Sequence, residues 1–367
     1  MKKNLFKKIV FVITVFLLLT VIAFTIFMVI NKYSFNDLAL MLSREKITDV
    51  GVYKTIDVNN ENTEVCLLNN YIYVVNPYKV LIYDINGERV NEQINDFENP
   101  YISYNDDFMI LYDSSKTYYE IYKDGKKTQS VESGNLSAVV ASRSDYISII
   151  KTGFEGFSGE VITENSKDGT YAAVKYANLY PVSTTVLGNS DFYVVVSIDA
   201  MDLNSSNVDL YNLYKEKPVA GMKIEGEYFK ILSLGDELFL LIGEQGYQLY
   251  DSNLMMIDSN TASVRHSACH GGNTYLAYTQ NGKNYVLCLN SDGKEVFKNQ
   301  VDFNIEGLFA GKNAMTVYNS SNIVIYSPDG KLIEKLNLFS LTRKVLLTEN
   351  DIIAVVGIDD IVLYKYQ

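Results

Sequence analysis

The sequence predicts an all-β fold, an eight-bladed β-propeller that follows one N-terminal transmembrane helix. Three observations support this prediction: an apolar run near the start of the chain, a strand-like phrase that recurs eight times, and tight-turn dipeptides after many of its copies. Of the 367 residues, 47% are hydrophobic and 13% are aromatic, so the chain can bury a large core and is too apolar for a disordered protein.

Residues 9–30 form the predicted membrane span, because they include 22 consecutive positions without a charged side chain. As a helix this segment is about 33 Å long, which matches a hydrocarbon core of about 30 Å. Four lysines precede the span and only Lys32 closely follows it, so the positive-inside rule places the N-terminus in the cytoplasm and the rest of the chain outside. A cleaved signal peptide is the alternative, but the apolar region of a signal peptide is usually only about 7–15 residues long.

We therefore predict a single-pass protein of the cell membrane with four parts. They are a cytoplasmic tail at residues 1–8, the transmembrane helix at residues 9–30, a juxtamembrane helix and linker at residues 31–50, and an extracytoplasmic propeller at residues 51–367. The first 32 residues hold five cations and no acid, which leaves the rest with 27 basic and 44 acidic residues, a net charge of −17. Nucleic-acid binding is therefore not expected.

A short apolar phrase, often ending in Tyr or Tyr-Asp, recurs after residue 51. Its eight copies lie at residues 80–84, 119–122, 160–163, 208–211, 247–251, 285–289, 323–326 and 361–364. The strands that precede these copies begin at spacings of 37 to 46 residues, so a second landmark gives the same count. Four strands in each repeat of about 40 residues, with no helix between them, are typical of a β-propeller blade. Seven blades is the alternative, if one irregular copy between residues 150 and 225 is not a blade.

Dipeptides suited to the positive φ angles of tight hairpin turns follow many copies of the phrase. We expect each to join the third strand of a blade to the fourth, at Asn86-Gly87, Asp124-Gly125, Asp168-Gly169, Asp292-Gly293 and Asp329-Gly330. The last copy is followed by no further strand before Gln367, so the segment from Val52 to Val58 is predicted to supply the missing strand and close the ring. Such closure removes exposed sheet edges.

The pattern apolar-Tyr-Asp-x-Asn/Asp-Gly followed by another strand, seen around residues 81–90, 287–297 and 325–333, resembles the quinoprotein-like eight-bladed propellers. It is also similar to uncharacterised single-pass membrane proteins of Gram-positive, clostridial bacteria that carry such a ring after an N-terminal anchor. Quinoprotein blades typically carry a Trp that docks neighbouring blades, but this chain has no Trp. We therefore expect Tyr and Phe to pack between the blades, and we predict no quinone or other cofactor.

The three Cys residues cannot form a disulfide framework in so long a chain, and we expect them in the core. Cys269 and the only two His residues, His266 and His270, invite a zinc interpretation. On one β-strand, however, the two His residues are about 13 Å apart and Cys269 points to the opposite face. We therefore predict no metal site. With two His residues and no nucleophile-elbow sequence, we also predict no catalytic residues.

One end of the ring is predicted to carry the binding site. Turns between first and second strands, and between third and fourth strands, are mostly short, whereas long irregular loops at Thr152–Gly159 and Asp199–Asn207 join second and third strands. Because antiparallel strands place these two sets of turns at opposite ends, the irregular set marks the likelier binding end.

Three cations lie near the predicted starts of innermost strands at this end: Lys230, Arg265 and Arg343. We hypothesise that they bind an anionic group near the channel mouth, with Phe154 and Phe157 as apolar contacts at the rim. The alternative is that the three cations only neutralise neighbouring acids.

The predicted function is that of a non-catalytic binding or scaffolding module, tethered outside the cell membrane, that engages a protein partner or an envelope polymer. The alternative is an enzyme that uses the propeller channel, either a glycan-active or a quinoprotein-like one. Rigid rings with variable loops suit binding, although the fold is only an analogy for function.

Overall fold

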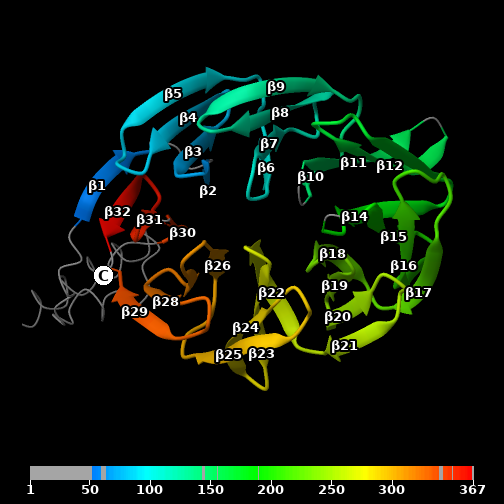
Figure 1. Ribbon diagram of the computed structural model, residues 1–367. Coiled ribbons are helices and arrows are strands. Elements are labelled where there is room, and N and C mark those ends of the chain that lie inside the picture. The colour runs from blue at the N-terminus through cyan, green and yellow to red at the C-terminus, as the bar shows by residue number, and fades with distance from the viewer. Residues whose placement is uncertain are drawn as a thin grey trace, which may run out of the picture. The chain divides into compact units, whose positions relative to one another are not determined.

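The computed structural model describes residues 52–58, 63–142, 145–154, 156–188, 190–338, 342–348 and 350–365. These residues form eight four-stranded antiparallel sheets, arranged as blades around a central channel (Figure 1). The predicted eight-bladed propeller is therefore confirmed, and the seven-bladed alternative is wrong. The predicted tail, membrane span and juxtamembrane helix lie outside the described residues. Within the described part, no helix is long and apolar enough to cross a bilayer.

The first four blades follow one another along the chain, and each runs from the channel outward. Blade 1 contains β2 (Glu64–Leu68), β3 (Tyr71–Asn76), β4 (Lys79–Asp84) and β5 (Arg89–Ile94). Blade 2 contains β6 (Tyr101–Tyr104), β7 (Met109–Tyr112), β8 (Tyr118–Lys123) and β9 (Lys126–Glu132). Blade 3 contains β10 (Ala138–Ala141), β11 (Tyr146–Phe154), β12 (Phe157–Asn165) and β13 (Tyr171–Tyr176). Blade 4 contains β14 (Leu179–Val186), β15 (Phe192–Asp199), β16 (Asp202–Asn212) and β17 (Ala220–Glu225).

The last four blades repeat this order until the end of the chain. Blade 5 contains β18 (Tyr228–Ser233), β19 (Leu238–Gly243), β20 (Gly246–Asp251) and β21 (Met256–Asn260). Blade 6 contains β22 (Ser263–His270), β23 (Asn273–Gln280), β24 (Lys283–Leu289) and β25 (Glu295–Val301). Blade 7 contains β26 (Gly307–Ala310), β27 (Met315–Tyr318), β28 (Asn322–Tyr326) and β29 (Leu332–Asn337). Blade 8 contains β30 (Lys344–Leu347), β31 (Ile352–Val356), β32 (Asp360–Lys365) and, as its outermost strand, β1 (Val52–Asp57).

The predicted closure of the ring is confirmed by the pairing of β1 with β32. Ile56 lies opposite Ile361 and Asp57 opposite Asp360 in an antiparallel register, so the two ends of the described chain share one sheet (Figure 1). Blade 8 is also joined to blade 1 by the ammonium of Lys344, which donates to the backbone oxygen of Val65 at 2.7 Å.

Tyr and Phe dock neighbouring blades, as expected for a chain without Trp. Tyr73 of blade 1 and Tyr122 of blade 2 meet edge to face, with ring centroids 6.1 Å apart, and the Tyr73 hydroxyl accepts a hydrogen bond from the Gly125 backbone N–H at 2.9 Å. Phe297 of blade 6 lies 6.3 Å from Tyr326 of blade 7. Both contacts bury apolar ring surface between sheets, which is the main stabilising contribution in such a stack.

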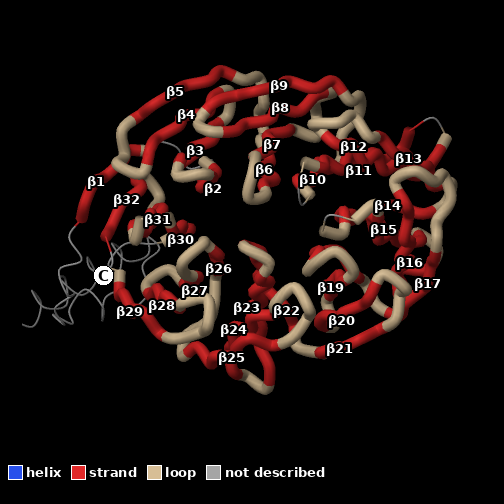
Figure 2. Tube along the Cα trace, in the orientation of Figure 1, coloured by secondary structure: helices blue, strands red, loops and turns tan. Residues whose placement is uncertain are grey.

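The predicted turns join third strands to fourth strands, as the sequence indicates. Their glycines all have φ between 72° and 83°, at Gly87, Gly125, Gly169, Gly293 and Gly330. Figure 2 shows the strands of each blade alternating with such loops around the ring.

Antiparallel order places the turns at two opposite ends of the channel. Turns from first to second strands, such as residues 105–108 and 271–272, lie at one end together with the third-to-fourth turns; we call it the cavity end. Turns from second to third strands, such as residues 77–78 and 200–201, lie at the other end together with the connections between blades; we call it the hairpin end.

Candidate functional site

The main cavity is the central channel near its cavity end. It has a volume of about 690 Å³ and is lined by residues from the inner strands of all eight blades and by several of the turns that follow them. Its position on the ring axis, at the edge of every sheet, is typical of propeller binding sites. A ligand here would contact several blades at once.

The polar part of the cavity wall carries serine and threonine hydroxyls together with three carboxylates, those of Asp106, Asp107 and Asp236, and several of the hydroxyls tie neighbouring inner strands together. The Ser103 hydroxyl of β6 accepts from the Ala141 N–H of β10 at 2.9 Å, and the Ser183 hydroxyl of β14 accepts from the Ile231 N–H of β18 at 3.2 Å. These bonds fix the wall. Thr184, which is only 1% exposed, has a side-chain oxygen with no hydrogen-bond partner among the described residues.

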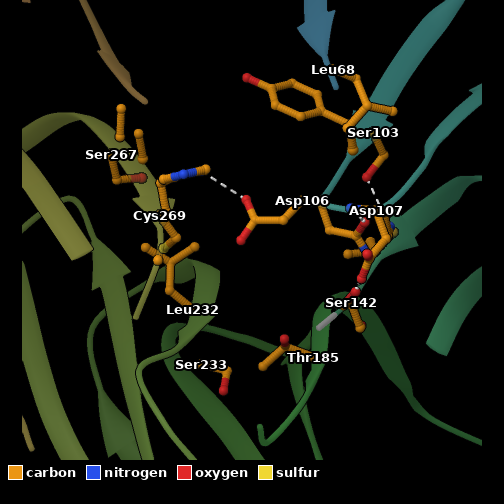
Figure 3. Close-up of a pocket in the computed structure, with 18 of the residues that line it drawn as sticks. Leu68, Ser103, Asp106, Asp107, Ser142, Thr185, Leu232, Ser233, Ser267 and Cys269 are labelled. Atoms are coloured by element: carbon orange, nitrogen blue, oxygen red, sulfur yellow. Dashed lines mark hydrogen bonds and ion pairs between the residues drawn. The ribbon is translucent and has the colours of Figure 1, made fainter. Parts of the chain in front are cut away.

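One ion pair crosses the cavity mouth between opposite blades. The Nδ1 atom of His270, at the end of β22, lies 2.9 Å from Oδ1 of Asp106 in the turn after β6. Blades 2 and 6 face each other across the ring, and in Figure 3 Asp106 points across the cavity toward the side that carries Ser267 and Cys269. We call this pair the strap. No sequence signal relates two turns so far apart in the chain.

A smaller cleft of about 200 Å³ lies between β18 and β22, toward the hairpin end. Lys230, Arg265, His266 and Ser267 line it, and Lys230 and Ser267 line the main cavity as well. The guanidinium of Arg265 donates to Oδ1 of Asn304 at 3.1 Å, which orients it.

The surroundings of the cleft disfavour positive charge. Desolvation in the channel lowers the pKa of Lys230, and the Cys269 thiol opposes this shift. Burial also lowers the pKa of His266; the nearby charges of Arg265 and Lys230 lower it further, while the Ile305 backbone and Glu306 act in the opposite direction.

Two of the five predicted site residues, Lys230 and Arg265, are therefore brought together. Arg343 is exposed on the connection before β30, in blade 8, and lines neither the cavity nor the cleft. His266 and Ser267 also line the cleft and were not among the predicted site residues. A regular strand was expected here, whereas the pairing of β22 with β23 shifts register between Val264 and His266.

The two predicted aromatic residues belong to blade 3, and Phe157 does not line the cleft. Phe157 is partly buried in β12, and the Lys175 ammonium lies 5.3 Å from its ring centroid. Phe154 lies opposite Phe157 in the backbone pairing of β11 with β12.

The prediction of long irregular loops at this end is wrong for the first segment, where backbone pairing of β11 and β12 continues to Phe154 and Phe157. In the second segment the pairing of β15 and β16 shifts register, because Ser206 lies opposite Ile198 and Asp202 lies opposite Asp199, so residues 203–205 have no partner on β15 and the predicted irregularity is confirmed there. Continued pairing satisfies backbone amide groups that an irregular loop would leave to solvent.

The hairpin end presents a group of exposed apolar side chains in blades 4 and 5, which we call the apolar surface. Its members, with their exposed fractions, are Tyr180 (42%), Met201 (94%), Leu203 (57%) and Phe229 (50%). Asp202, between two of them, is held by the ammonium of Lys223 at 2.6 Å. Met201 and Leu203 therefore lie at the tip of the hairpin formed by β15 and β16, and Tyr180 and Phe229 lie at the starts of β14 and β18.

The cysteines differ from the expectation in one respect. Cys66 and Cys288 are buried, as expected, but Cys269 is exposed and lines the main cavity. Among the described residues, no group of three or more His, Cys, Asp or Glu side chains is placed to hold a metal ion.

Fold and cavity together define an eight-bladed propeller with a polar central channel. Over residues 43–363 the sequence matches the family described as "Family of unknown function (DUF5711)", and the chain belongs to that family. No curated protein matches the chain significantly.

Several solved structures share the fold at low sequence identity. BamB from Moraxella catarrhalis has 12% identity and a TM-score of 0.54, covering 86% of this chain and 99% of that one. Sqt1 from Saccharomyces cerevisiae has 8% identity and a TM-score of 0.58, covering 85% and 98%. Apo AztD from Citrobacter koseri has 11% identity and a TM-score of 0.55, covering 81% and 94%. The likeness to BamB agrees with the expected quinoprotein-like fold, and at these identities it concerns the fold alone.

Proposed function

We propose that this protein is a membrane-tethered, extracytoplasmic binding module that engages a protein partner through the apolar surface at its hairpin end. The observation that carries the proposal is the exposure of four apolar side chains on neighbouring elements, with Met201 94% exposed at the hairpin tip. Exposed apolar and aromatic side chains that gather in one place are characteristic of protein interfaces.

The partner we propose is a basic protein or a basic segment of one. Residues 33–367 carry 27 basic and 44 acidic side chains, so electrostatic attraction favours an approaching cation-rich surface. The ion pair between Asp202 and Lys223 ties β16 to β17 beside Met201 and Leu203, and a contact that is ordered before binding loses less conformational freedom on binding.

The apolar surface can be tested by capture of partners from native membranes. The full chain, a Met201→Ser and Leu203→Ser double variant, and a Met255→Ser control are cross-linked in cells and purified. Met255 is 66% exposed but lies at the cavity end. We expect the double variant to lose proteins that both the wild type and the control retain. Equal capture by all three would remove the proposal.

The membrane tether rests on residues 9–30 and is tested separately. We expect the full chain to stay in membranes after alkaline carbonate extraction and its propeller to be cleaved by protease added to intact cells from which the wall has been removed. Deletion of residues 1–30 should release it. Release of the full chain by carbonate would contradict the tether and leave the apolar surface untouched.

A further inference from the structure

Two neighbouring inner strands carry a β-bulge where they border the small cleft. In β18 the register shifts between Tyr228 and Lys230, and in β22 it shifts between Val264 and His266. Phe229 and Arg265 are the extra residues. A bulge sets two successive residues against one on the partner strand and so changes where their side chains point, and such bulges often occur beside functional sites. Consecutive residues of β22, from Val264 to Ser267, line the cleft for this reason.

The regular inner strands show that the bulges are not a general feature of the ring. β2, β6, β10, β26 and β30 pair with their neighbours without a register shift. Apart from β18 and β22, only β14 among the inner strands has one, between Pro181 and Ser183. Among the inner strands, register shifts therefore occur only in blades 4, 5 and 6.

The cleft collects cationic side chains without an equal number of acids. Lys230 makes no ion pair or side-chain hydrogen bond with any described residue, and Arg265 donates to the neutral side chain of Asn304. The groups that act on His266 are two cations, Arg265 and Lys230, and one acid, Glu306. Cations placed together in this way repel one another and contribute nothing to stability by themselves.

We propose that the cleft between β18 and β22 is a binding site for an oxyanion, the phosphate or carboxylate group of a small hydroxyl-rich molecule. Arg265 offers a planar pair of donors, Lys230 a point charge, and Ser267 a hydroxyl. Lys230 and Ser267 also face the main cavity, so the body of the ligand extends there toward the cavity hydroxyls. The site borders the apolar surface at Phe229, which lines the cleft as well, but its ligand contacts are other side chains, so either proposal can fail without the other.

The site is tested by calorimetric titration of the detergent-solubilised full chain with four probes: inorganic phosphate, glucose 6-phosphate, glucuronate and glucose. We expect the anions to bind and glucose not to bind. Tighter binding of glucose 6-phosphate or of glucuronate identifies the preferred anionic group. If glucose 6-phosphate binds no more tightly than inorganic phosphate, the extension into the main cavity is wrong.

Variants separate a specific site from general attraction of anions. Lys230→Met and Arg265→Gln should each weaken binding of the preferred anion by about tenfold or more. Arg343→Gln removes the same charge from the same end of the ring and should change the affinity less than about twofold. Absence of anion binding at about 10 mM, or equal affinity in all three variants and the wild type, would overturn the proposal.

Proton uptake gives a second readout that is independent of fold stability. A bound anion favours the charged forms of His266 and Lys230 and so raises the pKa of each from its lowered value in the free protein. Binding of glucuronate, which stays ionised over this range, should therefore be tighter at pH 5.5 than at pH 8, and His266→Asn should reduce that difference. An unchanged pH dependence in His266→Asn would exclude His266 from the site.

Discussion

Two turns at opposite ends of the channel differ in how tightly they are packed against their neighbours. At the cavity end, Gly188 comes just after β14 and lies against the turn that follows β18. An added Cβ there would meet the Asp236 backbone nitrogen at 2.7 Å. At the hairpin end, Gly153 and Gly156 have nothing within 4 Å of the same position. Packing therefore varies from turn to turn: Gly271 at the cavity end has open space, whereas a Cβ added to Gly246 at the hairpin end would meet the Asn260 backbone oxygen.

The largest expected difference comes from adding one methyl group at each end. Gly188 has φ of +48° and no room for Cβ, so Gly188→Ala should lower the free energy of unfolding by about 3 kcal/mol. Gly156 has φ of +85° but open space, so Gly156→Ala should cost only about 1 kcal/mol. Urea unfolding of the full chain, followed by tyrosine fluorescence, measures both. Similar losses in the two variants would show that these two turns do not differ in packing.

Thiol reactivity should divide the cysteines by their relation to the cavity. Cys269 is exposed there, whereas burial raises the pKa of Cys66 to about 12 and that of Cys288 to about 11. A maleimide should therefore modify Cys269 on the order of a hundred times faster than either buried thiol in the folded protein. Mass spectrometry of digested protein locates the label, and the urea-unfolded chain, in which all three react, is the control. Early labelling of Cys66 or Cys288 would mean that blades open readily.

The sequence could predict the fold more fully than the candidate site. Blade number and closure were accessible because each repeat carries its own apolar alternation and turn dipeptide, which are local signals. Only half of the cleft could be predicted: Lys230 and Arg265 were found from charge and position, but nothing in the sequence marked His266 as their neighbour, because the register shift between Val264 and His266 has no local signature. A one-residue shift in register reverses which face a side chain occupies, and no local pattern announces it. The strap was beyond prediction, because His270 and Asp106 meet only through the geometry of the closed ring.

A smaller effect is expected from the strap. The side chains of Asp106 and His270 are 59% and 27% exposed, and an exposed pair of this kind contributes only about 0–1 kcal/mol to stability. Asp106→Asn should therefore speed labelling of Cys269 by a bulky maleimide no more than about fivefold, without changing labelling by a small one. Asp107→Asn, in the same turn, is the matched control. No change with the bulky reagent would show that the strap does not limit entry to the cavity.

The smallest effect concerns stability and pH at the cleft. Because burial lowers the pKa of His266 in the folded protein, the unfolded chain takes up this proton first as the pH falls through about 6.5. Stability is therefore lost with falling pH in that window, by less than about 1 kcal/mol for this group. His266→Asn should lessen the loss measured between pH 7 and pH 5, while Arg343→Gln should leave it unchanged. Added phosphate should also reduce this loss of stability in the wild type, because a bound anion favours protonated His266. The reduction should be smaller in Arg265→Gln. If added phosphate does not alter the pH dependence of the wild-type free energy of unfolding, the cleft binds no anion. Its cations would then lie together only because the stability of the surrounding ring offsets their repulsion.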